Sequence, residues 1–190
     1  MILHPDEIKL LVDRYPYLIP RNVWTGVVSQ DYDYSYFVGN NLGGWERLFL
    51  LYCKTIRKPL ADVNRLNTFM FTDVKEKYGS LRLYNVETSE AVIEITTQFE
   101  QMSKHICFQC GKIASYRTCG WVYPYCKSCI QRAKKCGETF TRIRRPNKVK
   151  IIHYSNNGTT KKLCKLRHLW REYEKCYTMT DKEFYTYLLT

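Results

Sequence analysis

The chain has 190 residues, 45% of them hydrophobic, and a formal net charge of +12. That length holds one mid-sized domain or two small ones, and the apolar content is enough for a core. The longest apolar run, residues 48–53, is too short to span a bilayer, and no basic stretch leads into an apolar run at the N-terminus. We therefore expect a cytoplasmic protein that binds no membrane, in which the nine cysteines are metal ligands and buried thiols rather than disulfides.

Residues 1–104 are predicted to form an N-terminal α/β region with three helices and a hairpin. Pro59 is expected to end the second helix, and Thr88 or Ser89 to cap the third. The turn of the hairpin falls at residues 77–80. Apolar spacing predicts helices over residues 5–15, 45–56 and 92–106, and strands over residues 23–28, 69–74 and 81–84.

Two cysteine pairs follow at the spacing of a metal site. Cys107 and Cys110 form one C-x-x-C knuckle, and Cys126 and Cys129 form a second one after fifteen intervening residues. Four thiolates in this arrangement suit a tetrahedral divalent ion, and zinc is the usual occupant. Because four protein ligands close the coordination sphere, we predict one structural Zn²⁺ that contributes to folding rather than to catalysis.

Residues 105–137 are predicted to be this zinc module. Strands over residues 113–117 and 121–125 are expected to form a hairpin between the knuckles, and a helix is expected over residues 130–136. A knuckle, a hairpin and a second knuckle that opens a helix follow the order of a treble clef. A zinc ribbon, with two hairpins and no such helix, is the alternative. The candidates for a second metal site are weaker: Cys119, Cys136, Cys164 and His168.

Residues 138–190 are predicted to be a basic C-terminal extension. Residues 139–145 and 148–154 are expected to pair across a turn at Pro146-Asn147, and Asn157-Gly158 is a further hairpin signal. A helix with an apolar face from Leu163 to Tyr173 follows, and then a short helix that opens with a capping box at residues 180–183. Together the three regions predict an α+β fold.

The charge of the chain is concentrated in its second half. Residues 1–104 carry 12 basic and 13 acidic residues, whereas residues 112–171 carry 16 basic residues and one acid, Glu138. Such a field attracts polyanions, of which nucleic acid is the commonest. On the predicted hairpin, four side chains are expected on one rim, which can lie along a phosphate backbone or in a major groove: Arg142, Arg144, Lys148 and Lys150. The wider set of candidate nucleic-acid-binding residues is Lys127, Arg132, Lys134, Lys135, Arg142, Arg144, Arg145, Lys148, Lys150, Lys161 and Lys162.

Aromatic residues are interleaved with this charge. Exposed rings can stack on bases, but Trp121 and Trp170 are expected to fill the core of the small module instead. A nuclease site is disfavoured because none of the four histidines lies between the knuckles, and His153 beside Asn156 and Asn157 is the only echo of one.

Residues 45–129 resemble a group of small zinc proteins common in phages and prophages. The matching features are Gly44-Trp45 at the head of a helix, the run Val-Lys-Glu-Lys-Tyr-Gly-Ser-Leu-Arg-Leu-Tyr at residues 74–84, and the two knuckles with Gly111. The resemblance implies a phage-type zinc protein, located in the host cytoplasm, and no particular activity. It covers less than half of the chain and leaves out the basic extension.

The favoured function is non-enzymatic binding of DNA or RNA through the basic half of the chain. The first alternative is a phage-encoded inhibitor of a host nucleic-acid machine, such as an RNA polymerase or a CRISPR effector (an anti-CRISPR protein). The second is a treble-clef nuclease. The first two need the same charge, so the sequence does not separate them.

Overall fold

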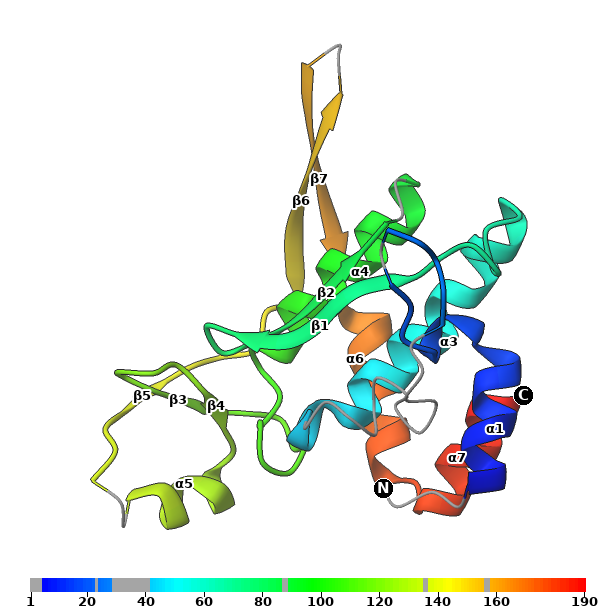
Figure 1. The fold of residues 1–190 in the computed structure, drawn as a ribbon. Coiled ribbons are helices and arrows are strands. Elements are labelled where there is room, and N and C mark those ends of the chain that lie inside the picture. Colours follow the sequence, from blue (N-terminus) through cyan, green and yellow to red (C-terminus); the bar gives the residue numbers. More distant parts are fainter. Residues whose placement is uncertain (1–4, 23, 29–41, 87–88, 135–136, 156–157) are drawn as a thin grey trace.

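A computed structural model describes residues 5–22, 24–28, 42–86, 89–134, 137–155 and 158–190 (Figure 1). The fold combines helices with small antiparallel sheets, which confirms the expected mixture of α and β structure. The helices of the described residues are α1 (Pro5–Arg14), α3 (Glu46–Asp62), α4 (Glu90–Ser103), α5 (Lys127–Lys134), α6 (Arg167–Thr178) and α7 (Asp181–Leu189), with 3-10 turns η1 (Pro16–Leu18) and η2 (Gly43–Trp45). The strands are β1 (Phe71–Lys77), β2 (Ser80–Asn85), β3 (Tyr116–Thr118), β4 (Pro124–Tyr125), β5 (Phe140–Arg142), β6 (Lys148–Ser155) and β7 (Gly158–Lys165).

One hydrophobic core joins the two ends of the chain. Helix α3 runs through its centre and packs against α4, α6 and α7, and α1 packs on α7 (Figure 1). Trp170 and Tyr173 of α6 and Phe184 of α7 belong to the same buried cluster as the apolar residues of α1 and α3. The side chain of Tyr15 donates a hydrogen bond to the carbonyl of Leu188, so the first and last helices are also linked directly. The division at residues 104 and 137 stays a prediction, but the first and third regions share this core.

The second helix is longer than predicted. Helix α3 continues through Pro59 and ends at Asp62, although a proline inside a helix removes one backbone donor. Leu60 lies one turn beyond Ile56 on the same face, and both are fully buried. Burying such a side chain contributes about 2 kcal/mol, which offsets much of the cost of the proline.

The predicted hairpin over residues 69–84 is confirmed as β1 and β2. Its strands pair up to Lys77 and Ser80, so that Tyr78 and Gly79 alone form the turn. The hairpin lies on α4, where the backbone N–H of Leu81 donates to Ser103 Oγ at 2.9 Å. Helix α4 ends at Ser103, three residues before the predicted end.

The strand predicted over residues 23–28 is not formed by residues 24–28, and Val23 lies outside the described residues. Arg21 and Val28 form an isolated bridge, and Trp24 and Thr25 lie in the turn between them. Asn22 holds this turn, because its side-chain oxygen accepts hydrogen bonds from the backbone N–H groups of both turn residues. A short asparagine-led loop therefore replaces the strand. Thr88, Lys135, Cys136, Asn156 and Asn157 lie outside the described residues.

The predicted pairing across Pro146-Asn147 is also wrong. Strand β5 pairs with β3, in a sheet of order β4-β3-β5, whereas β6 pairs with β7. The proline segment is an extended link held by α6: Trp170 Nε1 donates to the carbonyl of Pro146 at 2.9 Å, and Leu166 N donates to that of Asn147 at 2.9 Å. The β6–β7 ladder pairs eight residues of each strand without a break. It is longer than the pairing predicted across Pro146-Asn147, and therefore forms in its place. As a result Leu163 lies in a strand, and the helix predicted around it begins only at Arg167.

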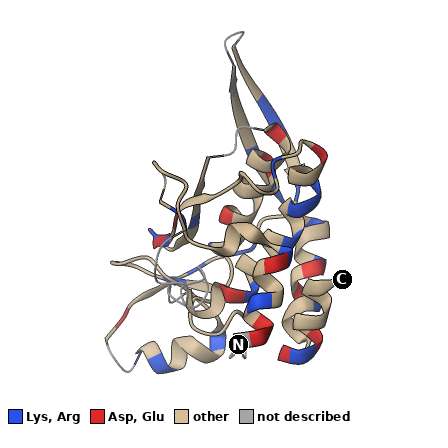
Figure 2. Ribbon diagram, turned by 45° about the vertical axis from the view of Figure 1, so that its right-hand side comes forward, with Lys and Arg blue, Asp and Glu red and all other residues tan. Residues whose placement is uncertain are grey.

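The β6–β7 hairpin projects from the rest of the molecule (Figure 1). The module formed by β3, β4, β5 and α5 lies at another side of the helical body. Most acidic positions lie on the helices of the body, as Figure 2 shows.

Candidate metal centre and basic hairpin

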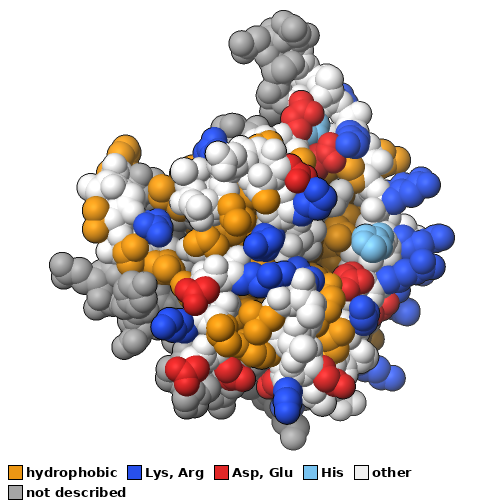
Figure 3. Space-filling model, turned by 90° about the vertical axis from the view of Figure 1, so that its right-hand side faces the viewer, with side chains coloured by type: hydrophobic (Ala, Val, Ile, Leu, Met, Phe, Trp, Pro, Cys, Tyr) orange, Lys and Arg blue, Asp and Glu red, His pale blue; other side chains and the backbone are white. Residues whose placement is uncertain are grey.

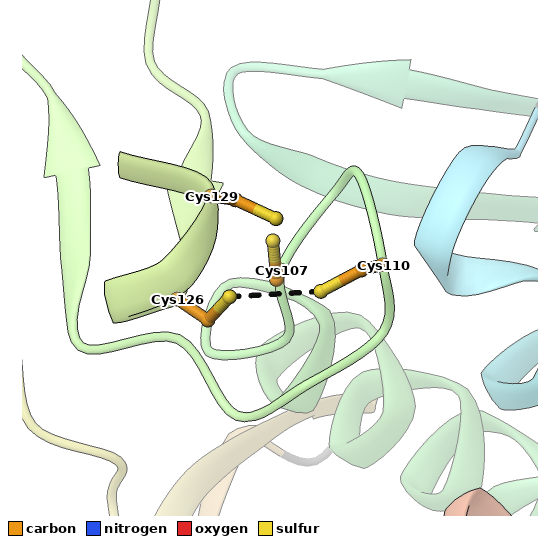
Figure 4. Close-up of side chains that lie close together, drawn as sticks. All are labelled: Cys107, Cys110, Cys126 and Cys129. Carbon is orange, nitrogen blue, oxygen red and sulfur yellow. Dashed lines mark hydrogen bonds between the residues drawn. The ribbon is translucent and has the colours of Figure 1, made fainter. Parts of the chain in front are cut away.

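The four cysteines of the two knuckles converge (Figure 4). Cys107 and Cys110 come from the loop after α4, and Cys126 and Cys129 from the start of α5. Their four Sγ atoms all lie within 4.8 Å of one another, and those of Cys110 and Cys126 are 3.6 Å apart. A tetrahedral ion with metal–sulfur bonds of about 2.3 Å places its sulfurs about 3.8 Å apart. The group is therefore able to hold one metal ion.

The electrostatics of the cluster favour a cation. Burial raises the pKa of Cys107 and of Cys110. Burial acts the same way on Cys126, but hydrogen bonds from Ser128 and from the backbone of Cys129 outweigh it and lower the pKa of the Cys126 thiol to about 6. The Cys126 thiolate therefore forms readily, whereas Cys107 and Cys110 resist ionisation. A divalent ion stabilises all four thiolates at once, so the donor set fits such an ion.

The backbone of the first knuckle is shaped by Gly111. This residue has φ +76°, a left-handed conformation that other residues adopt at a cost. Its N–H donates to the carbonyl of Cys107 at 2.9 Å, and Lys112 O accepts from Cys107 N at 2.7 Å. The carbonyl of Gly111 accepts a hydrogen bond from the hydroxyl of Tyr173 on α6 at 2.7 Å, so the core holds the knuckle from this side.

The segment before α3 holds the same knuckle from the other side, which the sequence analysis missed. A Cβ on Gly44 would lie 2.8 Å from the backbone nitrogen of Cys110 and closer still to Cys107 O and Gly111 N. Trp45 Nε1 donates to the carbonyl of Ile106 at 2.9 Å. The glycine pair in front of this tryptophan was the available signal, because a close backbone approach is a recognised use of glycine.

The turn of the β1–β2 hairpin contacts the module as well. A Cβ on Gly79 would lie 2.5 Å from the carbonyl oxygen of Val122, in the loop between β3 and β4. The segment before α3 and the β1–β2 turn thus both contact the module that carries the four cysteines.

The β6–β7 hairpin has one buried and one exposed face. Paired residues share a face, and Ile151 and Cys164 are buried on the face that packs on α4. There Glu94 of α4 forms an ion pair with Lys162, with 2.6 Å between Glu94 Oε1 and Lys162 Nζ. The same oxygen lies 3.4 Å from His153 Nε2. The opposite face, called the lysine face below, consists of exposed residues: Lys148, Lys150, Ile152, Lys161, Leu163 and Lys165.

The candidate basic residues come from several different elements. Lys127, Lys134, Arg142 and Arg144 are exposed outside the β6–β7 hairpin, so the predicted four-residue rim is not formed. Three others make internal contacts: Arg132 with Cys129 Sγ, Arg145 with Glu174, and Lys162 with Glu94. Lys148, Lys150 and Lys161 lie together on the lysine face. On the face seen in Figure 3, Lys and Arg gather along one edge.

Two other expectations have different outcomes. Trp170 is 3% exposed, which confirms its place in the core, whereas Trp121 is 70% exposed and not a core residue. In the part of the chain that the structure describes, the four-cysteine group is the only cluster of three or more potential metal ligands, so Cys119, Cys164 and His168 do not assemble into a second one there.

The chain matches no protein-family model, and neither the curated proteins nor the solved structures contain a match. Among the described residues, no helix has the length and apolar character that crossing a membrane requires.

Proposed function

We propose that this protein is a non-enzymatic nucleic-acid-binding protein with one structural zinc ion, of the phage type that the sequence resembles. The zinc ion is bound by Cys107, Cys110, Cys126 and Cys129 in a treble-clef-like module. The nucleic acid is bound by the lysine face of the β6–β7 hairpin.

The order of elements supports a treble clef over a zinc ribbon. The first knuckle is followed by the β3–β4 hairpin, and the second knuckle opens a helix, since Cys129 lies within α5. A zinc ribbon supplies its second ligand pair from another hairpin.

The lysine face is the observation that carries the proposal. Four lysines flank two apolar residues on it, and residues 148–165 contain no acid. In the described part of the chain none of these four lysines forms an ion pair, unlike Lys162 on the opposite face. Strands of eight residues are about 27 Å long, so the face spans several phosphates of a duplex. A two-stranded ribbon of this kind also fits a major groove.

The experiment is a salt titration of binding to duplex DNA and duplex RNA. Replacing Lys148, Lys150, Lys161 and Lys165 by Gln removes up to four phosphate contacts. The slope of log K against log salt should then flatten by up to about 3.6, at about 0.9 for each contact. The matched control replaces four exposed lysines elsewhere by Gln, with the same change in net charge: Lys9, Lys58, Lys175 and Lys182. Equal effects of the two variants on affinity and slope would contradict the proposal.

A second candidate is favoured by the apolar centre of the same face. Ile152 is 41% and Leu163 62% exposed, and exposed apolar side chains are suited to contact a partner protein. An inhibitor that docks on a host nucleic-acid machine, such as an RNA polymerase or a CRISPR effector, would use them. That reading predicts weak binding of free nucleic acid and retention of one host complex at moderate salt, which is lost when both residues are replaced by Ser.

We further propose that the protein does not hydrolyse nucleic acid. His153 contacts Glu94 on the buried face of the hairpin, away from the cysteine cluster. Incubation of DNA and RNA with Mg²⁺ or Mn²⁺ should give no product, and turnover that disappears in His153→Ala would support a nuclease instead.

A further inference from the structure

The turn of the β1–β2 hairpin carries an unexpected residue. Tyr78 has φ +54° and Gly79 φ +71°, the left-handed pair of a two-residue type I′ turn. Asn or Asp is favoured at the first of these positions, because a left-handed conformation strains most other side chains. Tyr78 is nevertheless 72% exposed, so neither turn preference nor burial in the core accounts for a tyrosine there.

A second exposed aromatic residue lies on the loop between β3 and β4. Trp121 is 70% exposed, although burial of this side chain would stabilise the fold. The loop itself is well fixed: Tyr123 N donates to Thr118 Oγ1 at 2.7 Å, and Thr118 Oγ1 donates to the carbonyl of Trp121. The indole is thus presented to solvent by an ordered loop.

The two loops are packed against each other. The backbones of Gly79 and Val122 approach closely, and Tyr78 and Trp121 each directly precede one of these two residues. Two steps of about 3.8 Å between consecutive Cα atoms are added to the short separation of Gly79 and Val122. The Cα atoms of the two aromatic residues therefore lie within about 14 Å of each other. A single strand of a few nucleotides is long enough to reach both.

Basic residues are found on both of these loop-bearing hairpins. The Nζ of Lys77 lies 5.7 Å from the centre of the Tyr78 ring, and Arg117 is exposed on β3. The neighbouring carboxylate is turned inward: Glu76 accepts a hydrogen bond from Gly79 N at 2.8 Å and contacts the hydroxyl of Tyr123. Rings beside basic side chains, with the acid withdrawn, are the composition of a single-strand binding surface.

We propose that Tyr78 and Trp121 form a stacking site for unpaired bases, with Lys77 and Arg117 beside the phosphates of the same strand. The proposal rests on the proposed function in one respect, that nucleic acid is the ligand, and it specifies a ligand with a single-stranded segment. Stacking needs an accessible base face, which a continuous duplex does not offer.

The test measures binding of a twelve-nucleotide oligothymidylate by anisotropy and by quenching of tryptophan fluorescence. Tyr78→Asn places a favoured residue in the turn, so the variant should be at least as stable as the parent protein and still bind the strand at least about fivefold more weakly. Trp121→Gln should weaken binding by a similar factor and remove most of the quenching. The matched control is Trp24→Gln, since Trp24 is 93% exposed on an unrelated turn and should leave affinity and quenching unchanged.

Binding to a duplex separates this site from the lysine face. Both aromatic variants should retain the salt-dependent duplex binding of the parent protein, whereas the lysine-face variant should bind the duplex more weakly and with a flatter salt slope. Unchanged affinity of Tyr78→Asn and Trp121→Gln for the oligothymidylate would overturn the stacking site and leave the proposed function intact. Failure of the parent protein to bind any duplex or single strand would overturn both.

Discussion

Gly44→Ala is the most direct test of how the N-terminal half supports the metal centre. The new Cβ would lie 2.8 Å from Cys110 N and closer still to Cys107 O and Gly111 N. All three are backbone atoms of the first knuckle, which hydrogen bonds hold in place. No flexible side chain is present at these contacts to move aside.

The expected cost follows from the number of overlaps. Overpacking by one methyl group costs about 1–3 kcal/mol when the neighbours can shift. Three backbone overlaps put Gly44→Ala at the upper end, about 3 kcal/mol or more. For a chain of this size, 1 kcal/mol corresponds to roughly 2–4 °C in Tm, so we expect a decrease of roughly 6–12 °C. Moving the knuckle away from α3 also displaces two of the four sulfurs, which should speed metal release.

Thermal unfolding of the zinc-loaded protein gives the first readout, and zinc transfer to a chromogenic chelator gives the second. The matched control is Gly120→Ala, because a Cβ at Gly120 meets no atom within 4 Å and its backbone is not left-handed. The control should stay within about 0.5 kcal/mol of the parent protein. If Gly44→Ala unfolds within 2 °C (about 0.5–1 kcal/mol) of Gly120→Ala and releases zinc equally slowly, the supporting contact does not exist as described.

Three further predictions address the metal, the last helix and the core. Elemental analysis should find one zinc per chain, and the Cys126→Ser/Cys129→Ser variant should lose cooperative unfolding in the presence of chelator, because metal binding contributes to folding; a zinc-free, fully folded protein would contradict this. Thr180→Ala should cost about 1 kcal/mol, measured by denaturant unfolding, because it removes the hydroxyl that accepts a hydrogen bond from Glu183 N in the capping box of α7. Hydrogen bonds from the backbone and the hydroxyl of Thr180 lower the pKa of Glu183, and the backbone bond persists in the variant. Only the bond from the hydroxyl to the carboxylate therefore adds a pH-dependent difference, which is present at neutral pH and is lost as the pH falls through the folded-state pKa of Glu183; a difference between variant and parent that grows in acid would refute it. A fragment ending at residue 137 should fail to unfold cooperatively, since α6 and α7 supply part of the core.

The local part of the fold and the four-cysteine cluster could be predicted from the sequence. Paired cysteines at short spacing specify their own geometry, and Thr180 with Glu183 forms the expected capping box. The hairpin over residues 71–85 was also predictable, because strong strand formers flank a turn with glycine in it. Each of these features depends on residues close together in the chain.

The partners of the C-terminal strands could not be predicted in the same way. Two adjacent hairpin signals competed, one at Pro146 and one at Gly158, and local propensity does not rank them. The choice depends on β3, which offers β5 an edge more than twenty residues away, and on α4, which covers the buried face of β6. The exposure of Trp121 was missed for a related reason. The loop that presents it is held by hydrogen bonds to the side chain of Thr118, and no residue pattern within the loop signals this.

The contacts around the first knuckle couple the four-cysteine cluster to the core. Gly44 reaches the knuckle from the segment before α3, and Tyr173 reaches it from α6, so both halves of the chain meet at Gly111. Loss of the ion should therefore destabilise the helical body, and not the small module alone. The lysine face differs, because the described part of its hairpin packs on α4 through the opposite face. The residues proposed to bind nucleic acid can consequently be changed with little effect on the fold, whereas the cysteine cluster and its glycine contacts cannot.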